Sequence, residues 1–225
     1  MKYINIYTLF LISAFGSSCG QNQTNSSKET IKAETKDGIN KVAKYEYTDP
    51  MGKRLIIQNG FPRGEPYTDP NGKEYFKVIF WTRIINETDS PLEFKIDFPV
   101  DSYEVPSLPG EHVKILIPPD TMTVDKESLF NYGLTGLKSF LDTSIDKPST
   151  LKRTINPKGS SGFYVVMLGP TTKVASGITR TGLSLKGQDL FYRFSRYASA
   201  PGLPLINEKE IHCGSINLKN LMLRK

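Results

Sequence analysis

The strict alternation of residues 92–98 constrains the fold of this chain more than any other feature. The stretch reads LEFKIDF, with apolar side chains at the even-numbered positions and charged side chains at the odd-numbered ones. A period of two fits a β-strand with one buried and one solvated face, and it does not fit the 3.6-residue repeat of a helix. Such one-sided strands are typical of antiparallel sheets. The stretch therefore predicts a sheet whose apolar face is covered by a second layer.

Similar strand signals recur along the chain, separated by loops rich in Pro, Gly, Asn and Asp. They cover residues 53–59, 73–86, 113–117, 150–155, 162–168, 177–186, 190–194 and 209–218. About nine or ten short strands predict an all-β chain, an antiparallel β-sandwich that is Ig-like or related, with one short helical insert. In 73–86 the second face carries Ile79 and Trp81 beside charged residues, so we expect another element to cover it in part. No βαβ alternation occurs, which argues against a parallel nucleotide-binding sheet.

The insert is expected at residues 126–142, where apolar residues recur at helical spacing. These residues are Phe130, Leu134, Leu137 and Leu141, and Asp125 is a suitable N-cap. Gly133 and Gly136 interrupt the pattern, so it predicts either one helix or two short helical turns. We expect this segment to close the open end of the sheet pair; the alternative is a binding helix.

One heptad occurs twice, as YTDPMGK at 47–53 and as YTDPNGK at 67–73. A calcium loop that began at Asp69 would need glycine at position 6 and glutamate at position 12. Here glycine stands at position 4 and Phe80 at position 12. Asp-Pro-x-Gly instead suits a tight turn in which glycine takes a positive φ. We therefore predict two hairpin turns and no metal site.

The amino terminus has the three parts of an export signal. Lys2 is followed by a mostly apolar run at 4–15 and by the small residues GSSC at 16–19. The run is about a dozen residues long, too short for a membrane-spanning helix of about twenty. FGSSCGQ resembles the lipobox of bacterial lipoproteins, although Gly16 stands where that pattern usually has Leu. The resemblance implies cleavage before Cys19 and attachment of a diacylglycerol to its thiol, with palmitate as the expected fatty acid; the alternative is a signal that is cleaved without lipidation.

These features divide the chain into three parts. Residues 1–18 are the expected signal peptide and residues 19–41 a flexible tether, because the latter hold almost no large apolar side chains. The β-sandwich domain is expected at 42–225. The only other cysteine is Cys213, so lipidation of Cys19 leaves no partner for a disulfide.

Two stretches carry a wider resemblance, VIFWTRIINETDSPLEFKIDFP and GLTGLKSFLD with the later LFYRF. Over residues from about Tyr45 onward, the chain is similar to uncharacterised envelope lipoproteins of the Bacteroidetes. That resemblance implies a lipid-anchored location in the cell envelope, at the outer membrane, and an Ig-like or related sandwich. It implies no activity and no site residues.

Catalytic patterns are scarce. His112 and His212 are the two histidines, each alone in its neighbourhood, and no Cys-x-x-Cys spacing occurs. We therefore expect no cofactor, no metal and no enzymatic activity. Paired carboxylates leave no signature in a sequence, so a small envelope hydrolase that uses loop carboxylates stays as the alternative.

Two further candidate sites concern surfaces. The chain carries a net charge of +6, and KGQDLFYRFSRY at 186–197 interleaves cations with aromatic residues. Export argues against nucleic acid, so we expect Lys186, Arg193, Arg196 and Tyr197 to meet an envelope protein or an anionic glycan; the alternative is a solvated strand face. The sequence DTM places Thr121 in a pattern that resembles O-glycosylation acceptors of Bacteroidetes exported proteins. The leading expectation is a lipid-anchored, non-enzymatic binding or scaffolding module.

Overall fold

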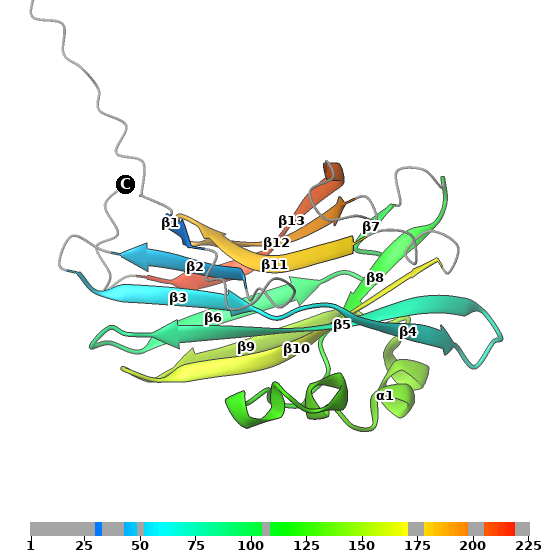
Figure 1. Ribbon diagram of the computed structural model, residues 1–225, viewed down its shortest axis with the longest axis horizontal. Coiled ribbons are helices and arrows are strands. Elements are labelled where there is room, and N and C mark those ends of the chain that lie inside the picture. The colour runs from blue at the N-terminus through cyan, green and yellow to red at the C-terminus, as the bar shows by residue number, and fades with distance from the viewer. Residues whose placement is uncertain are drawn as a thin grey trace, which may run out of the picture.

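The computed structural model describes residues 30–32, 43–48, 52–104, 109–170, 178–197 and 205–218. Within these residues the chain forms two antiparallel sheets that face each other, with a helical insert on the outside (Figure 1). The sequence-based prediction of an all-β antiparallel sandwich with a small helical insert is confirmed.

The larger sheet has the strand order β1-β2-β3-β5-β10-β8-β7, and β4 also pairs with β5. Its strands are β1 (Thr30–Lys32), β2 (Ala43–Thr48), β3 (Arg54–Asn59), β4 (Arg63–Thr68), β5 (Glu74–Asn86), β7 (Tyr103–Glu104), β8 (His112–Leu116) and β10 (Ser160–Pro170). Strands β5 and β10 form its centre, paired without a register shift from Ser160↔Ile85 to Pro170↔Tyr75. Because β5 is long, β3 pairs with its second half and β4 with its first half.

The smaller sheet has the strand order β11-β12-β13-β6-β9. Its strands are β6 (Leu92–Phe98), β9 (Ser149–Ile155), β11 (Ile178–Lys186), β12 (Asp189–Tyr197) and β13 (Leu205–Asn217). Strand β6 has the bounds that its alternation predicts, and its four apolar side chains are buried while the three charged ones are exposed.

The main core lies between the two sheets. Aromatic rings from both layers meet there, with Phe94 and Phe163 centroids 6.0 Å apart and Tyr103 and Phe194 centroids 5.8 Å apart. The inward face of β5 contributes Val78, as its alternation predicts. Burial of these apolar faces is the driving force that holds the layers together.

Side-chain hydrogen bonds join the layers along one edge. The Asn59 side chain donates from Nδ2 to the Leu183 carbonyl at 3.1 Å, and its Oδ1 accepts from the Leu183 N–H at 2.9 Å. Two residues further along β11, the Leu185 N–H donates to the Tyr47 hydroxyl at 2.7 Å. Side chains of β2 and β3 thus satisfy backbone groups of β11 that a neighbouring strand would otherwise bind.

The helical insert has three short parts, η1 (Val124–Lys126), η2 (Phe130–Gly133) and α1 (Leu137–Ser144). It covers the outer face of β5 and β10, where Trp81 and Tyr164 form a second core with Leu141. The partial cover predicted for the second face of 73–86 is therefore present. The prediction that the insert closes the open end of the sheet pair is wrong. The insert instead buries the outer apolar faces of β5 and β10.

Helix ends also differ from the prediction. Asp125 lies inside η1 and caps nothing; Thr123 holds the N-cap position of η1 without a side-chain bond, and Gly136 holds that of α1. Gly136 has φ 65°, so it turns the chain just before α1 begins. The segment therefore forms short helical turns interrupted at the glycines, and not one continuous helix.

The second copy of the repeated heptad is the predicted hairpin turn between β4 and β5. Gly72 has φ 83°, and the Gly72 N–H donates to the Asp69 carbonyl at 3.0 Å. The Asp69 carboxylate accepts from the N–H groups of Asn71 and Lys73 at 2.9 and 2.8 Å. In the first copy Gly52 has φ 77°, while residues 49–51 lie outside the described residues.

Strand β1 lies within the range expected for the tether. Its three residues pair with Glu46, Tyr45 and Lys44 of β2. Pairing at a sheet edge uses backbone groups and requires no large apolar side chains. This explains how a polar segment can add a strand that hydropathy does not reveal.

Candidate functional site

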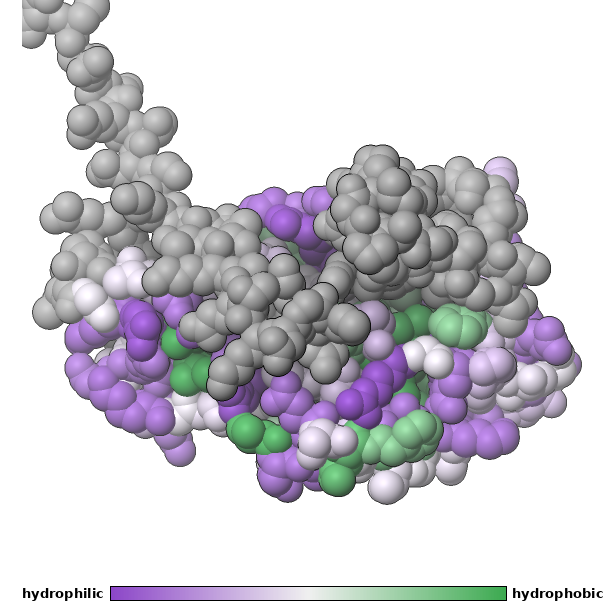
Figure 2. Space-filling model, in the orientation of Figure 1, coloured by the Kyte–Doolittle hydropathy of each residue, from purple (hydrophilic) through white to green (hydrophobic). Residues whose placement is uncertain are grey.

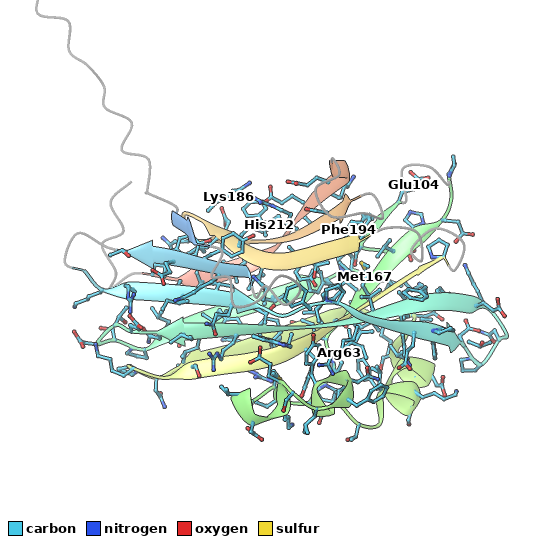
Figure 3. The ribbon with its side chains drawn as sticks, in the orientation of Figure 1. Arg63, Glu104, Met167, Lys186, Phe194 and His212 are labelled. Atoms are coloured by element: carbon cyan, nitrogen blue, oxygen red, sulfur yellow. The ribbon has the colours of Figure 1, made fainter. Side chains whose placement is uncertain are left out.

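A cleft of about 710 Å³ lies between the larger sheet and the helical insert. Phe61, Arg63 and Trp81 line it from the sheet side, and Asp125, Glu127 and Tyr132 line it from the insert. Figure 3 places Arg63 between the sheet and the insert. Concave sites of this size, lined by aromatic residues and a few polar groups, are the usual form of binding sites.

The floor of the cleft depends on a glycine. A Cβ atom at Gly60 would lie 2.2 Å from Nε1 of Trp81, so only glycine lets the β3–β4 connection approach this ring. The Gly60 N–H donates to the Trp81 carbonyl at 2.8 Å. Trp81 meets the ring of Tyr132 edge-on, with centroids 6.4 Å apart. The sheet and the insert are therefore in direct aromatic contact at the base of the cleft.

The wall on the insert side is a strained, left-handed turn. Asn131 has φ 45° and ψ 31°, Tyr132 has φ 57° and ψ 31°, and Gly133 follows with φ 66°. A non-glycine residue in this region costs about 1–2 kcal/mol. Strain of this kind persists only where surrounding contacts impose it, and it is concentrated at functional sites.

Three side-chain hydrogen bonds impose the turn. The Tyr132 hydroxyl donates to the Phe61 carbonyl at 2.7 Å, and the Tyr164 hydroxyl donates to the Tyr132 carbonyl at 2.7 Å. Asn131 donates from Nδ2 to a carboxylate oxygen of Glu65 at 3.1 Å. The turn is thus held from β4, from β10 and from the connection between β3 and β4.

Arg63 fixes the segment that precedes this turn. Its guanidinium lies 4.0 Å above the Tyr132 ring and donates to the carbonyls of Leu129 and Glu127. Burial raises the pKa of Tyr132, and the nearby Arg63 charge opposes this. The phenol therefore stays protonated at neutral pH and donates a hydrogen bond.

Above the cleft the insert exposes large apolar side chains. The exposed fractions are 58% for Val124, 50% for Leu129 and 81% for Phe130, the large hydrophobic residues exposed in the described part of the chain. Figure 2 shows apolar residues among polar ones along the lower side of the molecule, where the insert lies. We call Val124–Phe130, together with the mouth of the cleft, the insert surface. The three residues lie within seven positions of one another in the sequence, and contiguous exposed apolar patches mark sites of contact with a partner.

The cationic surface expected from the sequence lies on the other side of the molecule, where Figure 3 places Lys186. Its charges are opposed by acidic neighbours: Lys186 pairs with Glu210 at 2.6 Å, and Arg193 lies 3.5 Å from Glu208 and 3.7 Å from Glu210. The side chains of Arg196 and Tyr197 lie outside the described residues. The described half of this surface therefore does not present the uncompensated positive charge that an anionic glycan would select.

The two modification sites expected from the sequence are Thr121 and Cys19. Thr121 is exposed, at an isolated β-bridge to Phe163, and its carbonyl accepts from Lys126 Nζ at 3.0 Å. Its hydroxyl is therefore accessible on the surface. Cys19 and the signal peptide lie outside the described residues.

On the smaller sheet, Ser184 and His212 do not form a pair of nucleophile and base. His212 lies 3.5 Å from Asp189, as an oriented base would. However, Ser184 is in register with Phe191, and Phe191 is in register with His212. Ser184 and His212 are thus two strand spacings apart, about 9–10 Å, beyond the hydrogen-bond distance that a nucleophile and its base need.

No group of three or more His, Cys, Asp or Glu side chains in the described ranges could hold a metal ion. No helix of those ranges is long and apolar enough to cross a bilayer.

Sequence reasoning missed most of the cleft because its walls come from three distant segments, around residues 61–63, 81 and 124–132. Two signals pointed toward it: apolar residues on the second face of 73–86, and Asn131 two positions before Gly133, since Asn tolerates a positive φ. Comparison with protein-family models, with curated proteins and with solved structures finds no match.

Proposed function

We propose that this protein is a lipid-anchored module of the cell envelope, attached at the outer membrane through Cys19, that binds or scaffolds another envelope component without catalysing a reaction. The insert surface is its contact site. The export signal and the lipobox-like FGSSCGQ support the location, and the exposed apolar residues beside the cleft support the binding role.

Two features of the insert surface support the binding role: an exposed aromatic ring and a strained backbone next to it. Phe130 is 81% exposed and immediately precedes two non-glycine residues in a left-handed turn. Backbone strain disfavours the free folded state, and the exposed ring leaves apolar area in water that a partner can bury. A partner that buries Phe130 would offset this cost, because aromatic side chains supply much of the affinity at protein interfaces.

The position of the insert suits a partner beyond the anchoring membrane. Strand β1 and the insert lie on opposite sides of the molecule (Figure 1). Eleven positions separate Cys19 from Thr30, the first residue of β1. A chain anchored at Cys19 would therefore be attached on the side away from the insert surface.

The binding role is tested by affinity capture from detergent-solubilised envelope with the full-length chain as bait. Phe130→Ser should lose a partner that the wild type retains. Phe191→Ser makes the same substitution on the smaller sheet and should keep it. If the wild type and both variants capture the same envelope components, the insert surface is not the contact site.

The location has a separate test. Cells fed a fatty-acid analogue should label the wild-type protein, and Cys19→Ala should lose both the label and the membrane association. Equal labelling of the two proteins would exclude lipidation of Cys19.

The hydrolase alternative would be placed in the same cleft, since Asp125 and Glu127 both line it. Neither carboxylate is buried, whereas a carboxylic acid that serves as a general acid usually needs burial to raise its pKa. Activity against envelope glycans that Asp125→Asn or Glu127→Gln abolishes would favour the enzyme over the binding module.

A further inference from the structure

We infer that the cleft between the larger sheet and the helical insert binds a neutral saccharide. This inference goes beyond the proposed function, which concerns a partner held at the exposed apolar residues of the insert.

The indole of Trp81 is a buried donor at the cleft. Trp81 lines the cleft and is 3% exposed, and its Nε1–H donates to no acceptor in the described part of the chain. Nε1 is the atom nearest to the position of a Cβ at Gly60, which directly precedes the cleft residues Phe61 and Pro62. The polar edge of the indole therefore lies at the wall of the cleft. A buried donor without an acceptor is costly, so a ligand that offers a hydroxyl or carbonyl oxygen here gains affinity.

The same cleft holds several open acceptors. Asp125, Glu127 and Ser128 line it with side chains that are exposed or partly exposed. Within the described ranges, none of these three side chains forms an ion pair or a hydrogen bond. Carboxylates only accept hydrogen bonds, so the ligand must be rich in donors and must also present an acceptor to Trp81. Hydroxyl groups do both, and a sugar ring carries several, whereas a polypeptide backbone offers one N–H per residue.

The charges around the cleft select against an ionised ligand. The two carboxylates are balanced by the Arg63 guanidinium, which lines the cleft, and by Lys126, which lies between them in the sequence. Both cations already donate to backbone carbonyls of the insert or its flank. A charged ligand would therefore meet like charge as well as opposite charge, which gives little net attraction. Uncharged O–H groups still form charge-assisted hydrogen bonds with the carboxylates.

An apolar face completes the site. Phe61 and Pro62 line the cleft and are partly exposed. The C–H face of a pyranose ring can pack against them and leave water, while its hydroxyls reach the polar groups. The volume of about 710 Å³ lies within the usual range of small-ligand sites, about 300–1,000 Å³. A fatty chain would fill the same volume but leave the Trp81 N–H and the carboxylates without partners.

Trp81 is the only tryptophan of the chain, so its fluorescence reports on the cleft directly. The full-length chain, in a detergent without a sugar headgroup, is titrated with four neutral trisaccharides: maltotriose, cellotriose, mannotriose and chitotriose. At least one should shift the Trp81 emission in a saturable way. The glucosamine trimer, which is cationic, and trigalacturonate, which is anionic, should each bind at least tenfold more weakly than the best neutral sugar. A triserine peptide with blocked ends should do the same.

Variants assign the binding to the cleft. Asp125→Ala/Glu127→Ala should weaken binding of the best trisaccharide at least fivefold, and Glu208→Ala, on the smaller sheet, should leave it unchanged. Trp81→Phe keeps a ring and removes the N–H, so calorimetry should show at least threefold weaker binding. If Trp81→Phe does not fold, the alanine double variant decides, because neither of its residues is buried.

The outcomes separate this inference from the proposed function. Phe130 is not among the residues that line the cleft, so Phe130→Ser should bind the trisaccharide like the wild type. No change of emission with any of the four sugars, or unchanged affinity of the alanine double variant, overturns the inference. A charged trimer or the triserine peptide that binds as tightly as the best neutral sugar also overturns it. An envelope partner captured through Phe130 while no saccharide binds would preserve the proposed function and overturn this inference alone.

Discussion

At the level of single residues, Asp69 and Gly72 show how a repeated motif is used for backbone shape. Asp69 accepts two backbone hydrogen bonds and Gly72 adopts φ 83°, with nothing within 4 Å of the position of a Cβ atom. Because space is free there, a side chain at position 72 acts through backbone conformation alone.

Gly72→Val should lower the free energy of unfolding by about 1–2 kcal/mol through strain. Asp69→Asn should change it little, since the amide oxygen can accept the same two bonds. Urea denaturation of the three proteins measures both values. A melting temperature that rises with calcium in the wild type and not in Asp69→Asn would show that the motif binds the ion.

Buried phenols make the fold sensitive to alkaline pH. Burial, reinforced by the charge of Asp69, raises the pKa of Tyr75 to about 12; the unfolded value is about 10. Between these values the unfolded chain releases the proton first, so the free energy of unfolding should fall as pH rises from 10 to 12. Burial also raises the pKa of Cys213 to about 12, which adds to the effect.

Tyr75→Phe should make the decline of the unfolding free energy with pH shallower, by at most the contribution of one proton to the slope. Denaturation curves at half-unit pH steps from 9 to 12 measure the slope for both proteins. An identical slope would show that Tyr75 titrates alike in the folded and unfolded chains.

At the level of elements, a strand is predictable when its signal lies within its own sequence. Strand β6 was predicted with its full bounds, because alternation over seven residues is a property of the segment alone. Strand β4 was missed, since RGEPYT contains Gly64 and Pro66 and has no apolar alternation. Its place is set by pairing with β5, which the sequence of β4 does not encode.

The insert combines a buried face with an exposed one, and the two faces should respond differently to mutation. Leu141 is fully buried against the larger sheet, so Leu141→Ala should cost about 2–4 kcal/mol of unfolding free energy. Phe130→Ser should change it by less than about 0.5 kcal/mol, because the ring is already in water. Denaturation midpoints compare the two, and a large loss with Phe130→Ser would mean that Phe130 supports the fold.

At the level of the whole molecule, Asn59 joins the two sheets across one edge. Asn59→Ala would leave the Leu183 N–H and carbonyl and the Thr82 hydroxyl without their partner. Buried polar groups left unpaired cost about 1–3 kcal/mol each, so we expect a loss of about 2–4 kcal/mol after relaxation. A loss below 0.5 kcal/mol in urea denaturation would contradict a structural role for this bridge.

The two-layer architecture followed from the sequence because alternating strands require a partner for their apolar face. The cleft did not follow, because it exists only where the insert crosses β5. That crossing depends on the contact between Trp81 and Tyr132 and on the three hydrogen bonds that hold the left-handed turn. No single segment carries this information, which is why Phe61, Arg63 and Trp81 were not named as site residues from the sequence.

The most direct test of the insert surface as the binding site is photo-crosslinking in living cells. A photoreactive phenylalanine analogue is placed at position 130 in one strain and at position 191 in another, and the envelope is analysed after irradiation. We predict a discrete crosslinked product from position 130 and none from position 191. A product from position 191 alone, or none from either position, would contradict the assignment of the insert as the binding surface.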